Sequence, residues 1–134
     1  MNLIIKDELP MEQVQSSFNA LFPYLKLEFF SKLHETGQAT GLKFKLNPTA
    51  PIKNYRTIHG SDEIRIEPQM TANELEQLFA TQFGLGVQVF RRMGNATWIE
   101  TIATDDWTLE GLNTESEALL KVRKDRTGFS GVSG

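Results

Sequence analysis

FGLGVQVFRRMGNATWIETIAT, residues 83–104, contains the clearest hairpin in the chain and directly follows its clearest helix. Two of its segments, 87–93 and 97–103, are rich in the β-branched and aromatic residues that favour strands. Gly94 and Asn95 between them are typical of a tight turn, because glycine adopts positive φ without steric cost. The stretch therefore predicts two antiparallel strands at the centre of the fold.

Two registers are compatible with this hairpin. A two-residue turn pairs Arg91 with Trp98. A three-residue loop over 94–96 instead puts Arg92 on the same face as Trp98. Successive strand residues point to opposite faces, so only one of the two arginines can share a face with Trp98. The sequence leaves open which arginine it is.

The helix before the hairpin carries its own start and stop signals. Thr71 and Glu74 have the spacing of a capping box, in which each side chain accepts a hydrogen bond from the backbone N–H of the other residue. Gly84 stands where a left-handed residue ends a helix. These signals predict a helix over residues 72–83.

The rest of the chain divides into shorter elements. Apolar residues at helical spacing predict a helix that begins near Pro10 and ends at Pro23. The other expected elements are strands at 3–5, 25–29, 42–46 and 64–67, a weak strand within 52–58, and helical pieces between Thr108 and Lys121. Residues 122–134 are basic and rich in Gly and Ser. We therefore expect one domain over residues 1–121 and a flexible tail over 122–134.

The two halves of the chain have similar patterns. With a shift of 61 residues, Val14 overlies Leu75 and Phe18 overlies Phe79, and each half reads strand, helix, strand, strand. This order predicts an α+β fold with two βαββ-like halves, whose helices pack on one side of an antiparallel or mixed sheet, and a short C-terminal helical segment. Such a fold is either ferredoxin-like or pseudo-duplicated. The order is also similar to the paired βαβββ units of the vicinal-oxygen-chelate superfamily. That superfamily binds metal through His and Glu on strands. No predicted strand here carries a His, so the metal site is not implied.

Composition narrows the functional classes. The 134 residues have a net charge of -3 and a pI of about 5.4, which disfavours nucleic-acid binding by the domain as a whole. There is no cysteine, which excludes thiol catalysis, disulfides and thiolate metal sites. The N-terminus lacks the pattern of a signal peptide, and no segment reaches the roughly 20 apolar residues of a membrane span. We expect a cytoplasmic protein that does not enter a membrane.

One candidate ligand site lies on the hairpin. Arg91 or Arg92 beside Trp98 offers forked donors next to an aromatic face, a combination that binds carboxylates, phosphates or bases. The competing interpretation is structural, with an arginine stacked on the tryptophan at the surface of a strand.

A second candidate site follows the hairpin. Asp105 and Asp106 are paired carboxylates at a strand end, which can bind a cation or share a proton. The competing interpretation is turn chemistry, with Trp107 as a core plug that covers the hairpin.

Catalytic motifs do not occur in the sequence. It has no P-loop, no GxSxG elbow and no HExxH, and both histidines, His34 and His59, fall in predicted loops. We therefore expect no cofactor and no metal, and the sequence favours a non-enzymatic domain over an enzyme. Our leading hypothesis is a binding domain that acts through a protein partner or as a homodimer. The alternative is a small-ligand binder or enzyme with a pocket near Trp98, Trp107, Asp105 and Asp106. Weak nucleic-acid binding through the basic tail is the third hypothesis.

Overall fold

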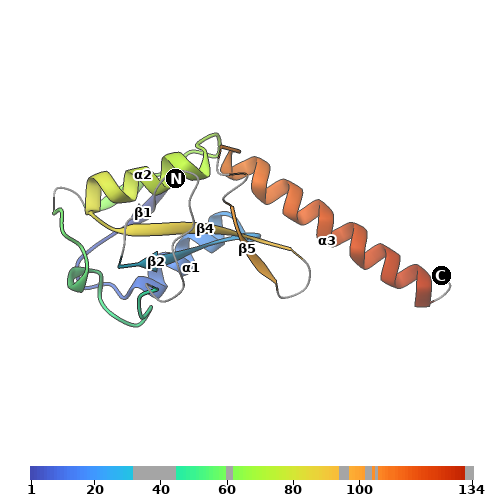
Figure 1. Cartoon of the computed structure of the whole chain (residues 1–134), viewed down its shortest axis with the longest axis horizontal. Coiled ribbons are helices and arrows are strands. Elements are labelled where there is room, and N and C mark those ends of the chain that lie inside the picture. Colours follow the sequence, from blue (N-terminus) through green and yellow to red (C-terminus); the bar gives the residue numbers. More distant parts are fainter. Residues whose placement is uncertain (32–44, 60–61, 94–96, 102–103, 105, 132–134) are drawn as a thin grey trace.

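The computed structural model (Figure 1) describes residues 1–31, 45–59, 62–93, 97–101, 104 and 106–131, with side chains as far as Lys121. Over these residues the chain forms one small α+β domain with five strands and three α-helices. In chain order the elements are β1 (Asn2–Ile4), α1 (Met11–Leu21), β2 (Leu25–Phe30), the short 3-10 helix η2 (Ile52–Asn54), β3 (Glu63–Arg65), α2 (Ala72–Phe83), β4 (Gly86–Arg92), β5 (Trp98–Glu100) and α3 (Leu109–Gly131).

The described strands form two antiparallel sheets. In one, β1 pairs with β3, and Leu3 lies opposite Ile64. The other has the order β2-β4-β5, and Leu27 lies opposite Val89. α1 packs on β2, and α2 and α3 pack on β4, so that all three helices cover the three-stranded sheet.

Alternation along β2 and β4 decides which face of this sheet forms the core. Leu25, Leu27 and Phe29 share a face with Val87 and Val89, and all five are at most 2% exposed. This confirms the alternating pattern predicted for the strand at 25–29. The helices close the same face with large side chains, among them Val14, Phe18, Leu75, Phe79 and Phe83. Burial of each such side chain stabilises the fold by about 1.5–3 kcal/mol.

The boundaries of α2 are those that the sequence predicts. The Glu74 N–H donates to the Thr71 hydroxyl at 3.1 Å, and the Thr71 N–H donates to the Glu74 carboxylate at 3.0 Å, which completes the capping box. Gly84 has φ 64° and ψ 29°, and its N–H donates back to the carbonyl of Ala80. The helix therefore ends at a left-handed glycine.

The register of the hairpin is that of the longer loop. Arg92 lies opposite Trp98, and the Met93 N–H donates to the Thr97 carbonyl at 2.7 Å. Three residues, 94–96, separate Met93 from Thr97, and they lie outside the described residues. The alternative with a two-residue turn, which pairs Arg91 with Trp98, is wrong.

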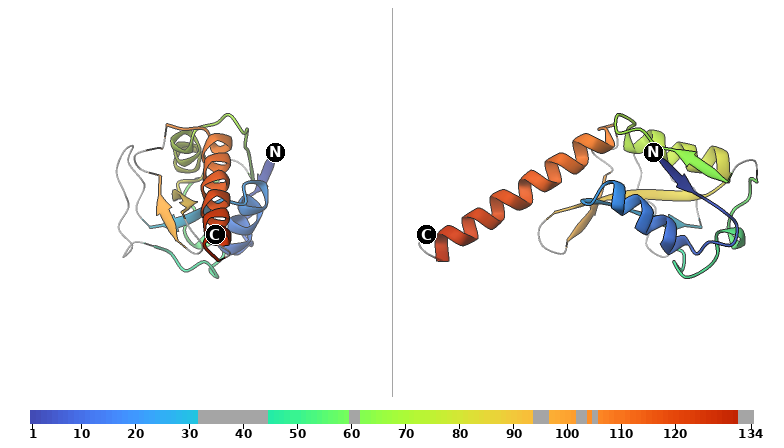
Figure 2. Two further views of the ribbon diagram at one scale, coloured as in Figure 1. Left: turned by 90° about the vertical axis from the view of Figure 1, so that its right-hand side faces the viewer. Right: turned by 180° about the vertical axis from the view of Figure 1, so that it is seen from behind.

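The C-terminal helix is longer and more continuous than expected. α3 is a single helix of 23 residues, whereas the sequence indicated a short segment in pieces. The Gly111 N–H donates to the Thr108 hydroxyl, which starts the helix, and Leu109 and Leu112 are fully buried beneath its first turns. Figure 2 shows α3 leaving the body of the domain and pointing away from it. The expected mobility of residues 122–134 stays a prediction.

The weak strand expected within residues 52–58 is wrong. The segment forms η2 and then a connection held by Arg56, whose side chain is 1% exposed. The Arg56 guanidinium donates to the carbonyls of Ile5 at 3.0 Å and Ile58 at 2.6 Å. These bonds keep the connection close to β1 and away from strand pairing. Of the strand expected at 42–46, residues 42–44 lie outside the described part, and Lys45 forms an antiparallel bridge with Phe30.

The shift of 61 residues also relates hydrogen bonds in the two halves. The Ile5 N–H donates to the Asp62 carbonyl, and the Ile66 N–H donates to the Met1 carbonyl, so the two bonds exchange under this shift. The same alignment relates residues that face each other in the two sheets. Leu3 lies opposite its counterpart Ile64, and Leu27 lies opposite its counterpart Val89. Pattern similarity in the sequence is thus matched by equivalent contacts.

Candidate interaction site at the root of α3

The hairpin register divides the predicted site residues between two faces of the three-stranded sheet. Arg92 and Trp98 lie opposite each other and share one face. Arg91 lies opposite Ile99 and points to the other face. The two arginines of the candidate site therefore belong to different surfaces.

Arg91 is held between the hairpin and α3. Its guanidinium lies 5.9 Å from the centre of the Trp107 ring and donates to the Glu115 carboxylate at 3.2 Å. The arginine side chain is only 13% exposed, so solvent screens this ion pair less than it screens one on the open surface. Arg91 thereby joins β4, the corner before α3, and the second turn of α3.

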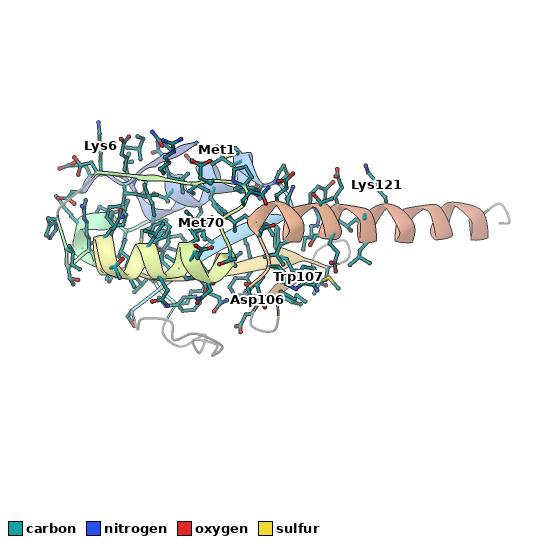
Figure 3. All side chains as sticks on the ribbon, turned by 90° about the horizontal axis from the view of Figure 1, so that it is seen from above. Met1, Lys6, Met70, Asp106, Trp107 and Lys121 are labelled. Atoms are coloured by element: carbon teal, nitrogen blue, oxygen red, sulfur yellow. The ribbon has the colours of Figure 1, made fainter. Side chains whose placement is uncertain are left out.

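Three large apolar side chains around this ion pair remain exposed to solvent. Ile99 is 37% exposed, Trp107 40% and Leu119 37%. We call these three residues, with Arg91 and Glu115, the root surface, because they surround the place where α3 leaves the domain. Figure 3 shows Trp107 beside the start of α3, and Lys121 further along the helix. Apolar side chains gathered beside charged ones are typical of contact sites for other macromolecules.

Trp107 reaches the surface because its backbone is fixed from two sides. Its N–H donates to the Thr104 carbonyl at 3.0 Å, and its carbonyl accepts from the Ala72 N–H at 3.2 Å. The interpretation of Trp107 as a core plug is wrong, since its ring lies over Arg91 and stays 40% exposed. Asp106 is exposed next to it (Figure 3), whereas Asp105 lies outside the described residues.

The opposite face of the sheet carries a second feature, next to α1. The Lys26 ammonium lies 4.9 Å from the centre of the Trp98 ring and 5.6 Å from that of Phe90. A cavity of about 290 Å³ opens beside this cation, and we call it the α1 groove. Its lining residues are Glu12, Gln15, Ser16, Asn19, Lys26, Leu27, Glu28 and Trp98.

Sequence reasoning missed Glu115 at the root surface and Lys26 in the groove. Glu115 comes from a segment 24 residues after Arg91, and no local pattern links the two. Lys26 follows the polar alternation of β2, which also describes an ordinary solvated strand face. The register with the three-residue loop places Trp98 on the same face of the sheet as Lys26. That register would therefore have indicated Lys26 as a neighbour of Trp98.

Metal ligands do not converge in the described part of the chain, where no three His, Asp or Glu side chains form a group. His59 Nδ1 lies 3.8 Å from Asp7 Oδ1, and Asp7 in turn contacts the guanidinium of Arg56 at 3.3 Å. These contacts link η2 to the start of α1. His34 lies outside the described residues.

No described helix has the length and apolar character needed to cross a membrane. Comparisons with protein-family models, with curated proteins and with solved structures find no match to this chain.

Proposed function

We propose that this domain is a non-enzymatic interaction module that associates with a second copy of itself through the root surface and α3. The observation that carries the proposal is the exposure of Ile99, Trp107 and Leu119 around the Arg91–Glu115 ion pair. Burying these side chains against a partner would remove their apolar area from water, at about 25 cal/mol per Å².

The shape and composition of α3 support an association. A helix of 23 residues is about 35 Å long, and among the side chains that the structure describes, Leu109, Leu112 and Ser116 are buried beneath its first turns. The remainder extends beyond the body of the domain (Figure 2). A helix segment without tertiary packing has marginal stability in water. Contact with a partner would supply the missing packing.

The charges along α3 favour a second copy as that partner. Its first half carries Glu110, Glu115 and Glu117, whereas residues 121–126 carry four basic residues and one acidic residue. Two such helices placed antiparallel would set the acidic half of each against the basic half of the other. Leu119 would lie near the centre of this arrangement. We assign the basic residues to this contact and not to nucleic acid, which the net charge of -3 disfavours.

Light scattering after size exclusion tests the proposal on the full chain. We expect the unmodified protein to run as a dimer at high concentration and Leu119→Glu to run as a monomer, because two carboxylates would meet at the centre of the contact. Ile58→Glu is the matched control. Ile58 is similarly exposed, at 43%, but its N–H bonds to Phe83 at the opposite end of α2 from α3. A strict monomer at high concentration, or equal dimerisation of all three proteins, would refute the proposal.

A second candidate function is small-ligand binding at the α1 groove, which is favoured by the half-buried ring of Trp98 and the cation of Lys26 beside it. We further propose that the two halves are a pseudo-duplicated pair of βαββ units. The exchange of the Ile5 and Ile66 hydrogen bonds under one shift supports this origin. The cytoplasm is the compartment that we propose, on the cysteine-free composition.

A further inference from the structure

The α1 groove runs between one face of α1 and the outer edge of β2. Glu12, Ser16 and Asn19 follow one another at helical spacing along α1 and form one wall. Residues 26–28 of β2 and Trp98 of β5 complete the lining. The groove volume of about 290 Å³ is at the lower end of the range for small-molecule pockets, which suits a ligand of amino-acid size.

The amide side chains in this wall present acceptors to a ligand. Gln15 Nε2 donates to the Leu27 carbonyl at 2.8 Å, and Asn19 Nδ2 donates to the Leu25 carbonyl at 2.9 Å. With their nitrogens engaged by the edge of β2, both amides retain their oxygens for a ligand. The carboxylate of Glu12, on the exposed side of the same wall, makes no ion pair with any side chain that the structure describes. This wall therefore favours a hydrogen-bond donor with positive charge.

The other side of the groove offers the opposite charge. Lys26 rests against the rings of Phe90 and Trp98, and none of the described carboxylates is within ion-pair distance of its ammonium. Glu28, the nearest acid along β2, is already engaged by Gln15 and by the ammonium of Lys45. The Lys26 ammonium is thus a donor that an anionic group can use.

We propose that the α1 groove binds a small zwitterion, an α-amino acid with an apolar or aromatic side chain. The ligand carboxylate would contact the Lys26 ammonium, and the ligand ammonium would contact Glu12 and the Gln15 amide oxygen. The ligand side chain would lie on the half-buried ring of Trp98, where apolar and aromatic groups stack favourably. Each of the three parts of the ligand has a complementary group in the groove.

Isothermal titration calorimetry on the full chain tests this site with three probes. Phenylalanine has all three parts, 3-phenylpropionate lacks the ammonium, and phenethylamine lacks the carboxylate. We expect saturable binding of phenylalanine and affinities for the other two that are lower by about tenfold or more, the loss expected for one charge-assisted hydrogen bond. Equal binding of 3-phenylpropionate, or no saturable binding of phenylalanine at millimolar concentrations, would overturn the proposal.

Variants separate the groove from the rest of the molecule. Lys26→Met should weaken phenylalanine binding by about tenfold, because it removes the partner of the ligand carboxylate but keeps an apolar chain on Trp98. Lys53→Met is the matched control, since Lys53 is exposed on η2 and does not line the groove, and it should bind unchanged. If both variants bind alike, the assignment of Lys26 is refuted. Leu119→Glu should bind phenylalanine normally, so the failure of self-association and the failure of this site are distinguishable.

Discussion

Replacing Gly84 by Ala is expected to destabilise the domain strongly for a single added methyl group. Gly84 ends α2 with φ +64°, a conformation that costs an L-residue about 1–2 kcal/mol. The carbonyl of Phe83, the residue before it, also accepts hydrogen bonds from the N–H groups of Thr57 and Ile58. The helix end therefore cannot move without releasing the connection after η2.

The new methyl group would also collide with this connection. A Cβ on Gly84 would lie 1.8 Å from the Thr57 hydroxyl oxygen, 3.1 Å from Thr57 Cβ and 3.4 Å from Ile58 Cγ1. Rotation of the hydroxyl relieves the first contact but leaves the second one tight. Overpacking of this kind costs about 1–3 kcal/mol. Together with the backbone term, we expect a loss of about 2–5 kcal/mol in the free energy of unfolding.

A double-mutant cycle isolates the part of this cost that comes from the Thr57 hydroxyl. Urea unfolding followed by circular dichroism would be measured for Gly84→Ala, Thr57→Ala and the double variant. Thr57→Ala alone should change stability by at most about 0.5 kcal/mol, because the Thr57 hydroxyl reaches the Gly84 carbonyl only at 3.5 Å. Thr57→Ala removes the hydroxyl but keeps the Cβ, so Gly84→Ala in this background should still cost the backbone term and the tight contact with that Cβ at 3.1 Å. The coupling energy then measures the contact with the hydroxyl alone, about 1 kcal/mol.

Gly111→Ala is the matched control for this cycle. Gly111 lies in the first turn of α3 without positive φ, and a Cβ there would meet only the Thr108 hydroxyl, at 3.0 Å. Alanine is the better helix former by about 1 kcal/mol, so this variant should be neutral or slightly stabilised. The reasoning is refuted if Gly84→Ala costs less than Gly111→Ala. A coupling energy of zero would refute the contact with Thr57 while leaving the backbone argument intact.

Two further substitutions should lower stability. One removes the acceptor of a backbone N–H in β4, and the other removes the N-terminal cap of α2. Glu76→Ala should cost about 1–3 kcal/mol, because it leaves the buried Val89 N–H, which donates to the Glu76 carboxylate at 2.9 Å, without an acceptor. Urea unfolding should show the loss, Glu76→Gln should recover part of it, and unchanged exchange of the Val89 amide hydrogen would contradict the assignment. Thr71→Ala should cost about 1 kcal/mol by removing the hydroxyl of the capping box, and Thr71→Ser should restore most of it. The urea midpoint measures both changes, and equal midpoints for the Ala and Ser variants would argue against the cap.

Most of the secondary structure of this chain could be predicted from patterns of residues that are close together in the sequence. The start and end of α2 could be predicted from Thr71, Glu74 and Gly84, because capping depends on residues within one or two turns. The alternation of β2 likewise follows from one buried face. The hairpin register could not be decided in this way, since a glycine at residue 94 suits both turn lengths.

The candidate site was harder to predict, because its contacts join distant segments. Arg91 and Trp107 were both singled out, but their proximity depends on the corner that the Ala72 N–H fixes against α2. Arg56 gave no local signal at all. Its burial depends on the Ile5 carbonyl, 51 residues away, which supplies the acceptor that a buried guanidinium requires.

The proposed pseudo-duplication would explain why the root surface has no counterpart among the described residues of the first half. The Ile52 N–H donates to the Leu9 carbonyl, and the Leu109 N–H donates to the Met70 carbonyl, so η2 and the first turn of α3 occupy equivalent places. In the first half the helix ends after Asn54 and the chain turns toward β3. In the second half it continues to Gly131. The proposed dimer contact is therefore an extension that only one half possesses.

The α1 groove likewise lies where the two halves differ in chemistry. At equivalent places, the Gln15 amide donates to the Leu27 carbonyl, whereas the Glu76 carboxylate accepts from the Val89 N–H. Glu76 in α2 is 2% exposed, while Gln15 in α1 stays partly exposed and lines the groove. If the two halves are a pseudo-duplicated pair, as proposed, a site that used only contacts common to both halves would occur twice. Both proposed sites instead depend on side chains that differ between equivalent positions of the two halves. We therefore expect one ligand and one dimer contact per chain.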